Sequence, residues 1–511
     1  MRTKKIFVNV AVNFIGYFVF IVTTFFLRKK MHYMLGLEAM GLDAVFSNIV
    51  SVLSITELGI GYGMNYKLYK LIAEKKWNKI ATLLNFIKKI YLIVSIVIFA
   101  LGCISFLFIL RRMDSGLPEV FIGKVFFLYI FDVTSSYLFF HRRIMFMVDQ
   151  KNYLNNIVKI FVSILFFTLR MLSLGVLKSF EVYIILKIIS NLLENTIIAF
   201  LFKKHYSHVN LKNASKFEKT ERKEIAENIK SLFYHKIGGA CAGRIPGLIA
   251  FLNIPLNVNG IYYSYCLIIN AILGISGELF NGISASFGNF LNTETNDKIY
   301  ENFKVLYFLN FLLYSFLSVA FFMIANTFMK LWMGGGVFLF SDFTVGIMTI
   351  SLYICGMKQC VDMTKISAGI YSQDRFCPIF EALFNFVFSY FLSKNIGVTG
   401  IFLGNILSTL LIPFIFQPFF IYKLIFKKKL VNYYKEYVVY LFLTLLYFYL
   451  CNLLIFGLNM INLSLVFQIF LRFSVCFMLI FPINLILFMN SFEFRKIFIL
   501  ISGLFKKINK N

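Results

Sequence analysis

The sequence predicts an all-α polytopic membrane protein, and three observations lead to that class. The 511-residue chain is 59% hydrophobic and only 15% charged, whereas soluble domains carry roughly a quarter charged residues. Its mean hydropathy is +0.78. Apolar runs of about 20 residues, the length that crosses the hydrocarbon layer, recur along the whole chain. Because lipid offers the backbone no hydrogen-bond partners, these runs are expected to be helices.

About fourteen such runs are predicted as transmembrane helices, joined by short loops. The segment MRTKK leads directly into a full-length first helix, so no cleavable signal is expected. An even number of helices places both termini on one side of the membrane. The expected ranges are 6–27, 39–63, 86–110, 119–141, 154–177, 180–202, 231–253, 258–286, 303–326, 336–357, 371–393, 397–422, 436–457 and 464–490.

The distribution of positive charge indicates which side that is. Lysines and arginines gather in alternate loops and in the tail, at residues 67–89, 203–230, 427–429 and 506–510, and the opposite loops hold few. Cytoplasmic loops carry such an excess, so both termini are predicted to be cytoplasmic. The net charge of +27 is therefore attributed to topology and to contacts with anionic lipids, and no nucleic-acid binding is expected.

Charge and helix spacing also predict the domain organisation. The longest loop, 203–230, is polar and separates an N-terminal six-helix bundle, 1–202, from a second six-helix bundle, 231–422. Two extra helices and a basic cytoplasmic tail are predicted in 423–511.

Internal similarity supports two equivalent bundles. TELGIGYGMN at Thr56–Asn65 matches GELFNGISAS at Gly277–Ser286, and DQKNY at Asp149–Tyr153 matches SQDRF at Ser372–Phe376. The two offsets, about 221 and 223 residues, nearly agree. Because halves of six helices have the same orientation, this predicts a parallel repeat about an axis along the membrane normal.

One long stretch resembles a known family. GLEAMGLDAVFSNIVSVLSITELGIGYGMNYKLYKLIAEKKWNKI at Gly36–Ile80 is similar to the opening of bacterial polysaccharide-exporting flippases. These form the Wzx-type branch of the superfamily that also contains multidrug and lipid II exporters. The resemblance covers roughly the first 430 residues. Further similar stretches are YHKIGG at Tyr234–Gly239, YYSYCLIINAI at Tyr262–Ile272, LWMGG at Leu331–Gly335 and CPIFEALFNFVFSYFLSKNIGVTGIFLGN at Cys377–Asn405.

The resemblance implies a V-shaped pair of six-helix bundles around a cavity and transport by alternating access. The implied substrate is an undecaprenyl-diphosphate-linked oligosaccharide, moved from the inner to the outer leaflet of a bacterial cytoplasmic (inner) membrane for O-antigen or capsule assembly. No cofactor is implied, and a polysaccharide polymerase and glycosyltransferases are implied as partners. Relatives commonly carry a Thr-Asp-Asn-like stretch where this chain has ACAGRIPGL, Ala240–Leu248. The missing acid puts an acid-dependent ion coupling in doubt.

Moving a diphosphate past hydrocarbon requires a hydrated cavity lined by cations. Arginine suits this task because its planar fork binds phosphate oxygens in a bidentate manner. The candidates are Arg244 in the seventh helix, Arg28 and Lys29 at the end of the first, Arg170 in the fifth and Arg142 after the fourth. The alternatives are a structural ion pair for Arg244, snorkelling to headgroups for Arg28 and Lys29, and topology-setting charge for Arg142.

Four acids are candidates for ion coupling or for a gate: Asp43, Glu57, Glu278 and Glu381. Glu57 and Glu278 occupy repeat-related helix ends followed by glycines, which favours a turn or a gate. Asp43 and Glu381 are the better coupling candidates, because intramembrane acids mark ion pathways. Coupling is not required: moving two negative charges outward across an inside-negative 100 mV releases about 4–5 kcal/mol.

Lys187 and Glu194 lie seven residues apart in the predicted helix 180–202 and therefore share a face. We expect each to form a structural ion pair with the other's neighbours or with Lys159. Lining of the cavity is the alternative.

Two other functions fit parts of the pattern. A multidrug exporter of the same fold is the alternative transporter, but the basic excess argues against it. A polymerase or ligase would need a long outward loop with catalytic Arg or His, and no loop exceeds about 30 residues. The chain has no GxxxxGK[ST] segment and its eight cysteines lack metal-site spacing. The sequence therefore predicts a transporter without a cofactor or metal.

Overall fold

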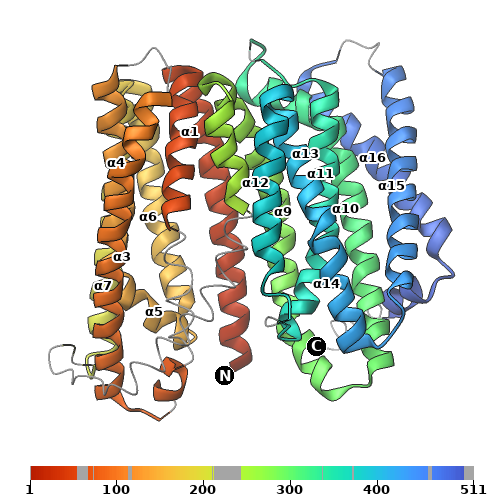
Figure 1. Ribbon diagram of the computed structural model, residues 1–511, viewed down its shortest axis with the longest axis horizontal. Coiled ribbons are helices and arrows are strands. Elements are labelled where there is room, and N and C mark those ends of the chain that lie inside the picture. The colour runs from red at the N-terminus through yellow and green to blue at the C-terminus, as the bar shows by residue number, and fades with distance from the viewer. Residues whose placement is uncertain are drawn as a thin grey trace. The chain divides into compact units, whose positions relative to one another are not determined.

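The all-α polytopic membrane fold is confirmed. Where the chain is described, no residue lies in a strand, and eleven helices are long and apolar enough to span a membrane by length and composition. Figure 1 shows these helices as long rods. The computed structural model describes residues 2–54, 67–72, 74–112, 118–209, 211, 243–336, 338–370, 373–458 and 463–499.

The chain forms two compact units, Met1–Ser264 and Tyr265–Asn511. Residues 243–253 are also helical and belong to the first unit. The first unit contains α1 (Arg2–Leu53), α3 (Trp77–Arg112), α4 (Glu119–Tyr137), α5 (Phe140–Val148), α6 (Asn152–Leu172), η2 (Ser173–Leu177), α7 (Phe180–His205) and the start of α9 (Leu256–Thr293). The second contains the rest of α9, α10 (Asn296–Met333), α11 (Asp342–Ser367), α12 (Cys377–Ile396), α13 (Val398–Leu411), α14 (Pro413–Ile421), η4 (Tyr422–Phe426), α15 (Val431–Leu458) and α16 (Leu465–Phe488).

The first two predicted helices, 6–27 and 39–63, lie within α1. Gly36 breaks this element with a φ of 83° and a ψ of −179°, so two helical segments meet there. Glycine is suited to this position because a positive φ is costly for residues with a Cβ atom. The predicted interbundle linker falls largely outside the described residues, as do Glu57 and the TELGIGYGMN repeat unit, so the six-plus-six division stays a prediction.

The segment 243–264 packs against the second part of α1 within the first unit. A Cβ atom on Gly41 would lie 2.2 Å from the carbonyl oxygen of Leu256, and one on Gly260 would lie 2.9 Å from that of Leu37. These two glycines therefore let the backbones of α1 and α9 approach closely, as small residues do between membrane helices. Asn48 donates a hydrogen bond to the hydroxyl of Tyr263 beside them.

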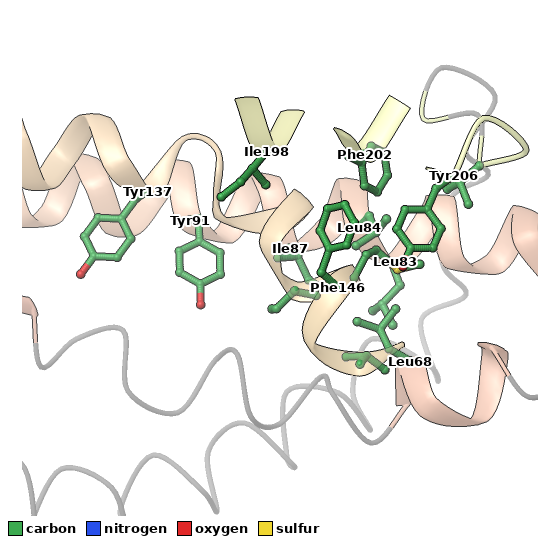
Figure 2. Packing of buried hydrophobic residues seen from close by; sticks show 14 of the residues in the cluster. Leu68, Leu83, Leu84, Ile87, Tyr91, Tyr137, Phe146, Ile198, Phe202 and Tyr206 are labelled. Atoms are coloured by element: carbon green, nitrogen blue, oxygen red, sulfur yellow. The ribbon is translucent and has the colours of Figure 1, made fainter. Parts of the chain in front are cut away.

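A hydrophobic cluster joins α3, α5 and α7 at one end of the first unit. Figure 2 shows Leu83, Leu84 and Phe146 grouped together, with Phe202 and Tyr206 beside them. Tyr206 also donates a hydrogen bond of 2.8 Å to Asp149. This cluster fixes α5, the short helix after α4, against α7, and so sets the position of the charged side chains between them.

In the second unit, α12 and α13 form a closely packed pair. Gly400 and Gly404 face Ser389 and Ser393, so small residues spaced four apart oppose each other. A Cβ atom on Gly404 would lie 2.4 Å from the backbone nitrogen of Ser389, and one on Gly400 would lie 2.5 Å from that of Ser393. Such pairs let membrane helices gain van der Waals contact along their length.

Candidate functional site

A cavity of about 360 Å³ lies within the first unit. Four basic and two acidic side chains reach it from three elements, α1, α6 and α7, together with hydroxyl, amide and aromatic groups. It is lined by Phe20, Thr23, Thr24, Leu27, Arg28, Met31, Asp43, Ser47, Lys159, Ser163, Phe166, Phe167, Arg170, Tyr183, Lys187, Ser190, Asn191 and Glu194.

Arg28 is held in place at the wall of this cavity. Its side chain is 9% exposed. The Nε group donates a hydrogen bond of 2.8 Å to the hydroxyl of Ser264, and Nη2 donates one of 2.7 Å to the carbonyl of Gly260. Nη1 lies 4.0 Å from Oδ2 of Asp43. The other carboxylate oxygen, Oδ1, accepts a hydrogen bond from the hydroxyl of Tyr129. The guanidinium is therefore oriented by α9 and faces Asp43 at the wall of the cavity.

Arg170 lies in the last turn of α6 and stacks on an aromatic ring of α7. Its guanidinium carbon lies 4.2 Å from the ring centroid of Tyr183, a geometry that stabilises a cation without neutralising it. Tyr183 is also within electrostatic reach of Arg28 and Asp43. Both arginines therefore act at the same part of the cavity, around the Tyr183 hydroxyl.

Lys187 occupies the middle of the cavity and is compensated by an acid behind it. Its Nζ atom lies 3.4 Å from Oδ2 of Asp132 on α4 and 4.7 Å from the ring centroid of Tyr129. Asn191 donates a hydrogen bond to the other oxygen of Asp132. Asp132 is buried, so this pair places a compensated cation at the wall, where it also faces the cavity.

Glu194 and Lys159 are at the other end of the cavity. Glu194 pairs with Arg143 of α5 at 2.8 Å, and Arg143 also donates to the side-chain oxygen of Asn195 at 2.8 and 3.0 Å. Lys187 and Glu194 thus each form an ion pair, as expected, but their partners are Asp132 of α4 and Arg143 of α5 and not one another's neighbours or Lys159. In the described part of the chain, Lys159 makes no ion pair or hydrogen bond.

The resulting charge distribution favours an anionic ligand. Four basic side chains face two acidic ones. From outside the lining, Arg143 pairs with Glu194 and Asp132 pairs with Lys187, which leaves an excess of two positive charges. Hydroxyl and amide groups of Ser163, Ser190 and Asn191 line the space between the cations. The arrangement can bind phosphate oxygens through arginine forks and sugar hydroxyls through neutral polar groups.

The other predicted site residues are not part of the lining of this cavity. Lys29 is half-buried, with Nζ 6.0 Å from the Tyr33 ring centroid. Arg142 is half-buried on α5, where burial lowers the pKa of its guanidinium. Arg244 is half-buried on the helical segment 243–253. Among the acids, Asp43 lines the cavity, whereas Glu278 is half-buried on α9.

Glu381, the second coupling candidate, is in the second unit. It lies 3.2 Å from Nζ of Lys358, and Asp362 lies 3.9 Å from the same atom. Its role in ion coupling stays a prediction. From sequence, Lys159 was expected only as a pairing partner, and lining of the cavity by Lys187 was the alternative to an ion pair. The signal was present on α6, where Lys159, Ser163 and Arg170 follow one helical face.

Comparison with known proteins identifies the fold. No family model and no curated protein matches this chain. Among solved structures, the lipid II flippase MurJ in an inward closed conformation has a TM-score of 0.61 at 14% identity, covering 92% of this chain and 98% of that one. An inward-facing multidrug resistance MATE family transporter of the MOP superfamily has a TM-score of 0.59 at 12% identity, covering 77% and 92%.

This chain has the fold of MOP-superfamily transporters. A third example, a MOP superfamily transporter from Pyrococcus furiosus Vc1 described as having a binding pocket of reverse polarity, has a TM-score of 0.54 at 15% identity and covers 83% of this chain and 97% of that one. At such identities the likeness establishes the fold and leaves the substrate to the chemistry of the site.

Proposed function

We propose that this chain is a flippase for undecaprenyl-diphosphate-linked oligosaccharides that serve in cell-surface polysaccharide assembly. The observation that carries the proposal is the cavity of about 360 Å³ in the first unit, which is lined by more basic than acidic side chains. Arg28 and Arg170 bind the diphosphate there, because two guanidinium groups near one point match its oxygens. The polyprenyl tail stays in the bilayer while the headgroup occupies the cavity. Such transport forms and breaks no covalent bond.

The polarity of the cavity also separates this proposal from multidrug export. A cationic drug entering the cavity would meet Arg28, Lys159, Arg170 and Lys187, and like charges at low dielectric repel strongly. A diphosphate meets the opposite situation, because its negative charge offsets the cost of keeping those cations inside a membrane. The basic cavity therefore favours an anionic lipid headgroup over a cationic drug.

The cellular setting follows from the same proposal. The protein is placed in the cytoplasmic membrane of a bacterium with both termini inside, where glycosyltransferases build the lipid-linked precursor. A polymerase on the opposite side would consume the exported unit as O-antigen or capsule. An inside-negative membrane potential favours outward movement of a diphosphate by about 4–5 kcal/mol for two charges, so the proposal needs no ion antiport.

Flipping is measured directly with purified full-length protein in liposomes. The probe is undecaprenyl diphosphate carrying a fluorescently labelled oligosaccharide, and an impermeant quencher reports the outer-leaflet fraction over time. Wild-type protein is expected to accelerate flipping relative to empty liposomes. Arg170→Met is expected to lower the rate about tenfold, equivalent to about 1.4 kcal/mol. Its guanidinium stacks on Tyr183 of α7.

Lys124→Met provides the matched control. Lys124 is an exposed cation of the same unit, 3.6 Å from Glu181 and outside the cavity, so its removal should leave the rate unchanged. Equal flipping by wild type and empty liposomes would contradict the proposal. Accumulation of a cationic dye that competes with the lipid, together with no effect of Arg170→Met, would favour the multidrug alternative.

A further inference from the structure

Two of the four cations that line the cavity lie at separate levels along α6. Lys159 and Arg170 both line it and are eleven residues apart on one helix. Eleven residues make three turns, so the two side chains share a face, and their Cα atoms are about 16 Å apart along the axis. The cavity is therefore long enough to place two basic groups at well-separated points.

The far level holds Lys159 beside an acid that another cation already binds. Arg170 stacks on Tyr183, and counting eleven residues from that contact along the two antiparallel helices places Lys159 level with Glu194. That acid is already bound by Arg143 at 2.8 Å. Lys159 is exposed into the cavity and, within the described ranges, makes no ion pair or hydrogen bond. A cation in that setting is costly unless an anion joins it.

One diphosphate cannot satisfy both levels, because it is much shorter than three helical turns. The pair Arg28 and Arg170 suits a diphosphate, since two guanidinium groups near one point attract its several charged oxygens. A single lysine ammonium is a compact point charge, which suits a group with one negative charge. Between the levels, Ser163, Ser190 and Asn191 offer hydroxyl and amide groups to neutral sugar hydroxyls.

We propose that the oligosaccharide itself is acidic, with one anionic substituent such as a hexuronate carboxylate bound by Lys159 at the level opposite the arginines. This inference rests on the proposed function and specifies its substrate class. Lys159 is a specificity-determining residue: it selects acidic over neutral sugars, while the arginines hold the diphosphate common to both.

The test compares two probes on the same undecaprenyl diphosphate: an oligosaccharide with one hexuronate residue, and its methyl ester, which is neutral but otherwise the same. Wild-type protein in liposomes is expected to flip the acid about tenfold faster than the ester at low probe concentration. Lys159→Met should remove this preference by slowing the acid alone. Lys159→Arg, which keeps the charge, should retain it.

The outcomes separate the two proposals. If wild-type protein flips both probes equally fast, or if Lys159→Met slows acid and ester alike, the acidic-sugar inference is wrong while the flippase proposal stands. If wild-type protein flips neither probe, the flippase proposal itself fails. A sugar phosphate in place of the hexuronate distinguishes the kind of anion: equal preference for both indicates charge recognition alone. Thermal unfolding of Lys159→Met, compared with Lys159→Arg, checks that the fold is retained.

Discussion

The two units treat buried charge in opposite ways. In the first unit, a cavity of about 360 Å³ is lined by four cations and two acids. In the second, the pocket beside Lys358, Gln417 and Tyr433 holds only about 10 Å³, room for a single water molecule. Three buried or half-buried lysines of the second unit have acidic partners, and these pairs are Lys304 with Glu436 and Glu493, Lys358 with Asp362 and Glu381, and Lys365 with Asp374.

The difference shows that an intramembrane cation can serve two purposes. In the second unit the cations join helices: Lys304 links α10 to α15, and Arg472 of α16 donates hydrogen bonds of 2.7 Å to Met323 and Thr327 on α10. In the first unit, the side chains of Arg28 and Arg170 line the cavity. The surroundings of each cation, and not its residue type, therefore indicate whether it stabilises the fold or binds a ligand.

The largest expected effect tests the ion pairs of the second unit. Lys358→Met leaves Glu381 and Asp362 without their cation, and removing one partner of a buried pair costs about 3–5 kcal/mol. Thermal unfolding in detergent should show this as a large loss of stability. The matched variant Lys187→Met should lose less stability, because Lys187 borders the cavity and Asp132 still accepts a hydrogen bond from Asn191. Equal losses would contradict the contrast between the units.

Arg28→Ala tests the first unit, which contains the cavity. It removes the proposed diphosphate ligand, so the flipping rate should fall about a hundredfold, or about 3 kcal/mol for charge-assisted hydrogen bonds. Arg28→Lys keeps the charge without the fork and should recover part of the rate. The control in the second unit is Arg472→Ala, which removes bonds to α10. Arg472→Ala should lower the unfolding temperature and leave the substrate concentration for half-maximal rate unchanged. A higher substrate concentration for half-maximal rate would contradict the contrast between the two units.

The pH dependence of stability gives a third test, at the end of the first unit away from the cavity. Burial, helped by the charges of Arg142 and Lys88, lowers the pKa of His141 to about 4. The unfolded chain binds a proton near pH 6.5, whereas the folded chain keeps His141 neutral. The contribution of about 3 kcal/mol is thus complete above pH 6.5 and lost as the pH falls toward 4.

His141→Gln provides the comparison for that test, because glutamine does not titrate. The wild-type unfolding temperature should fall more steeply than that of the variant between pH 6.5 and 4.5. Parallel curves would show that His141 is not held neutral in the folded state. Flipping rates at pH 7 are expected to be the same for both proteins, since His141 does not line the cavity.

The smallest expected effect compares packing. Gly404→Ala in the second unit would place a Cβ atom 2.4 Å from the backbone of Ser389, and overpacking costs about 1–3 kcal/mol. Gly16→Ala in the first unit meets the Ile160 side chain at 3.5 Å, an ordinary contact, so stability should change by less than about 1 kcal/mol. Equal destabilisation in thermal unfolding would show that the first unit is packed as tightly as the second at these positions.

The presence of the helices was predictable from sequence, because each apolar run must form its own hydrogen bonds inside lipid, but some of their ends were not: the predicted range 336–357 corresponds to α11, Asp342–Ser367. The predicted range 180–202 corresponds to α7, Phe180–His205, and 464–490 to α16, Leu465–Phe488. The range 119–141 was too long: α4 ends at Tyr137, and His141 belongs to the separate helix α5. Hydropathy does not detect this break, since Leu138, Phe139 and Phe140 continue the apolar run past the end of α4.

The site was only partly predictable. Arg28, Arg170 and Asp43 were proposed from sequence and line the cavity, whereas Lys29, Arg142 and Arg244 do not line it. Neighbours such as Arg28 and Lys29 differ by 100° around the helix, so one faces the cavity and the other does not. A charge count along the chain cannot separate them.

The sequence alone therefore determined that this protein crosses a membrane many times as helices, because local hydropathy and backbone hydrogen bonding decide that within each segment. Only the tertiary structure decided which cations share a cavity and which are neutralised. Pairings such as Glu194 with Arg143 and Lys187 with Asp132 join residues more than fifty positions apart. They depend on the rotation of each helix against its neighbours, which packing across the whole unit sets.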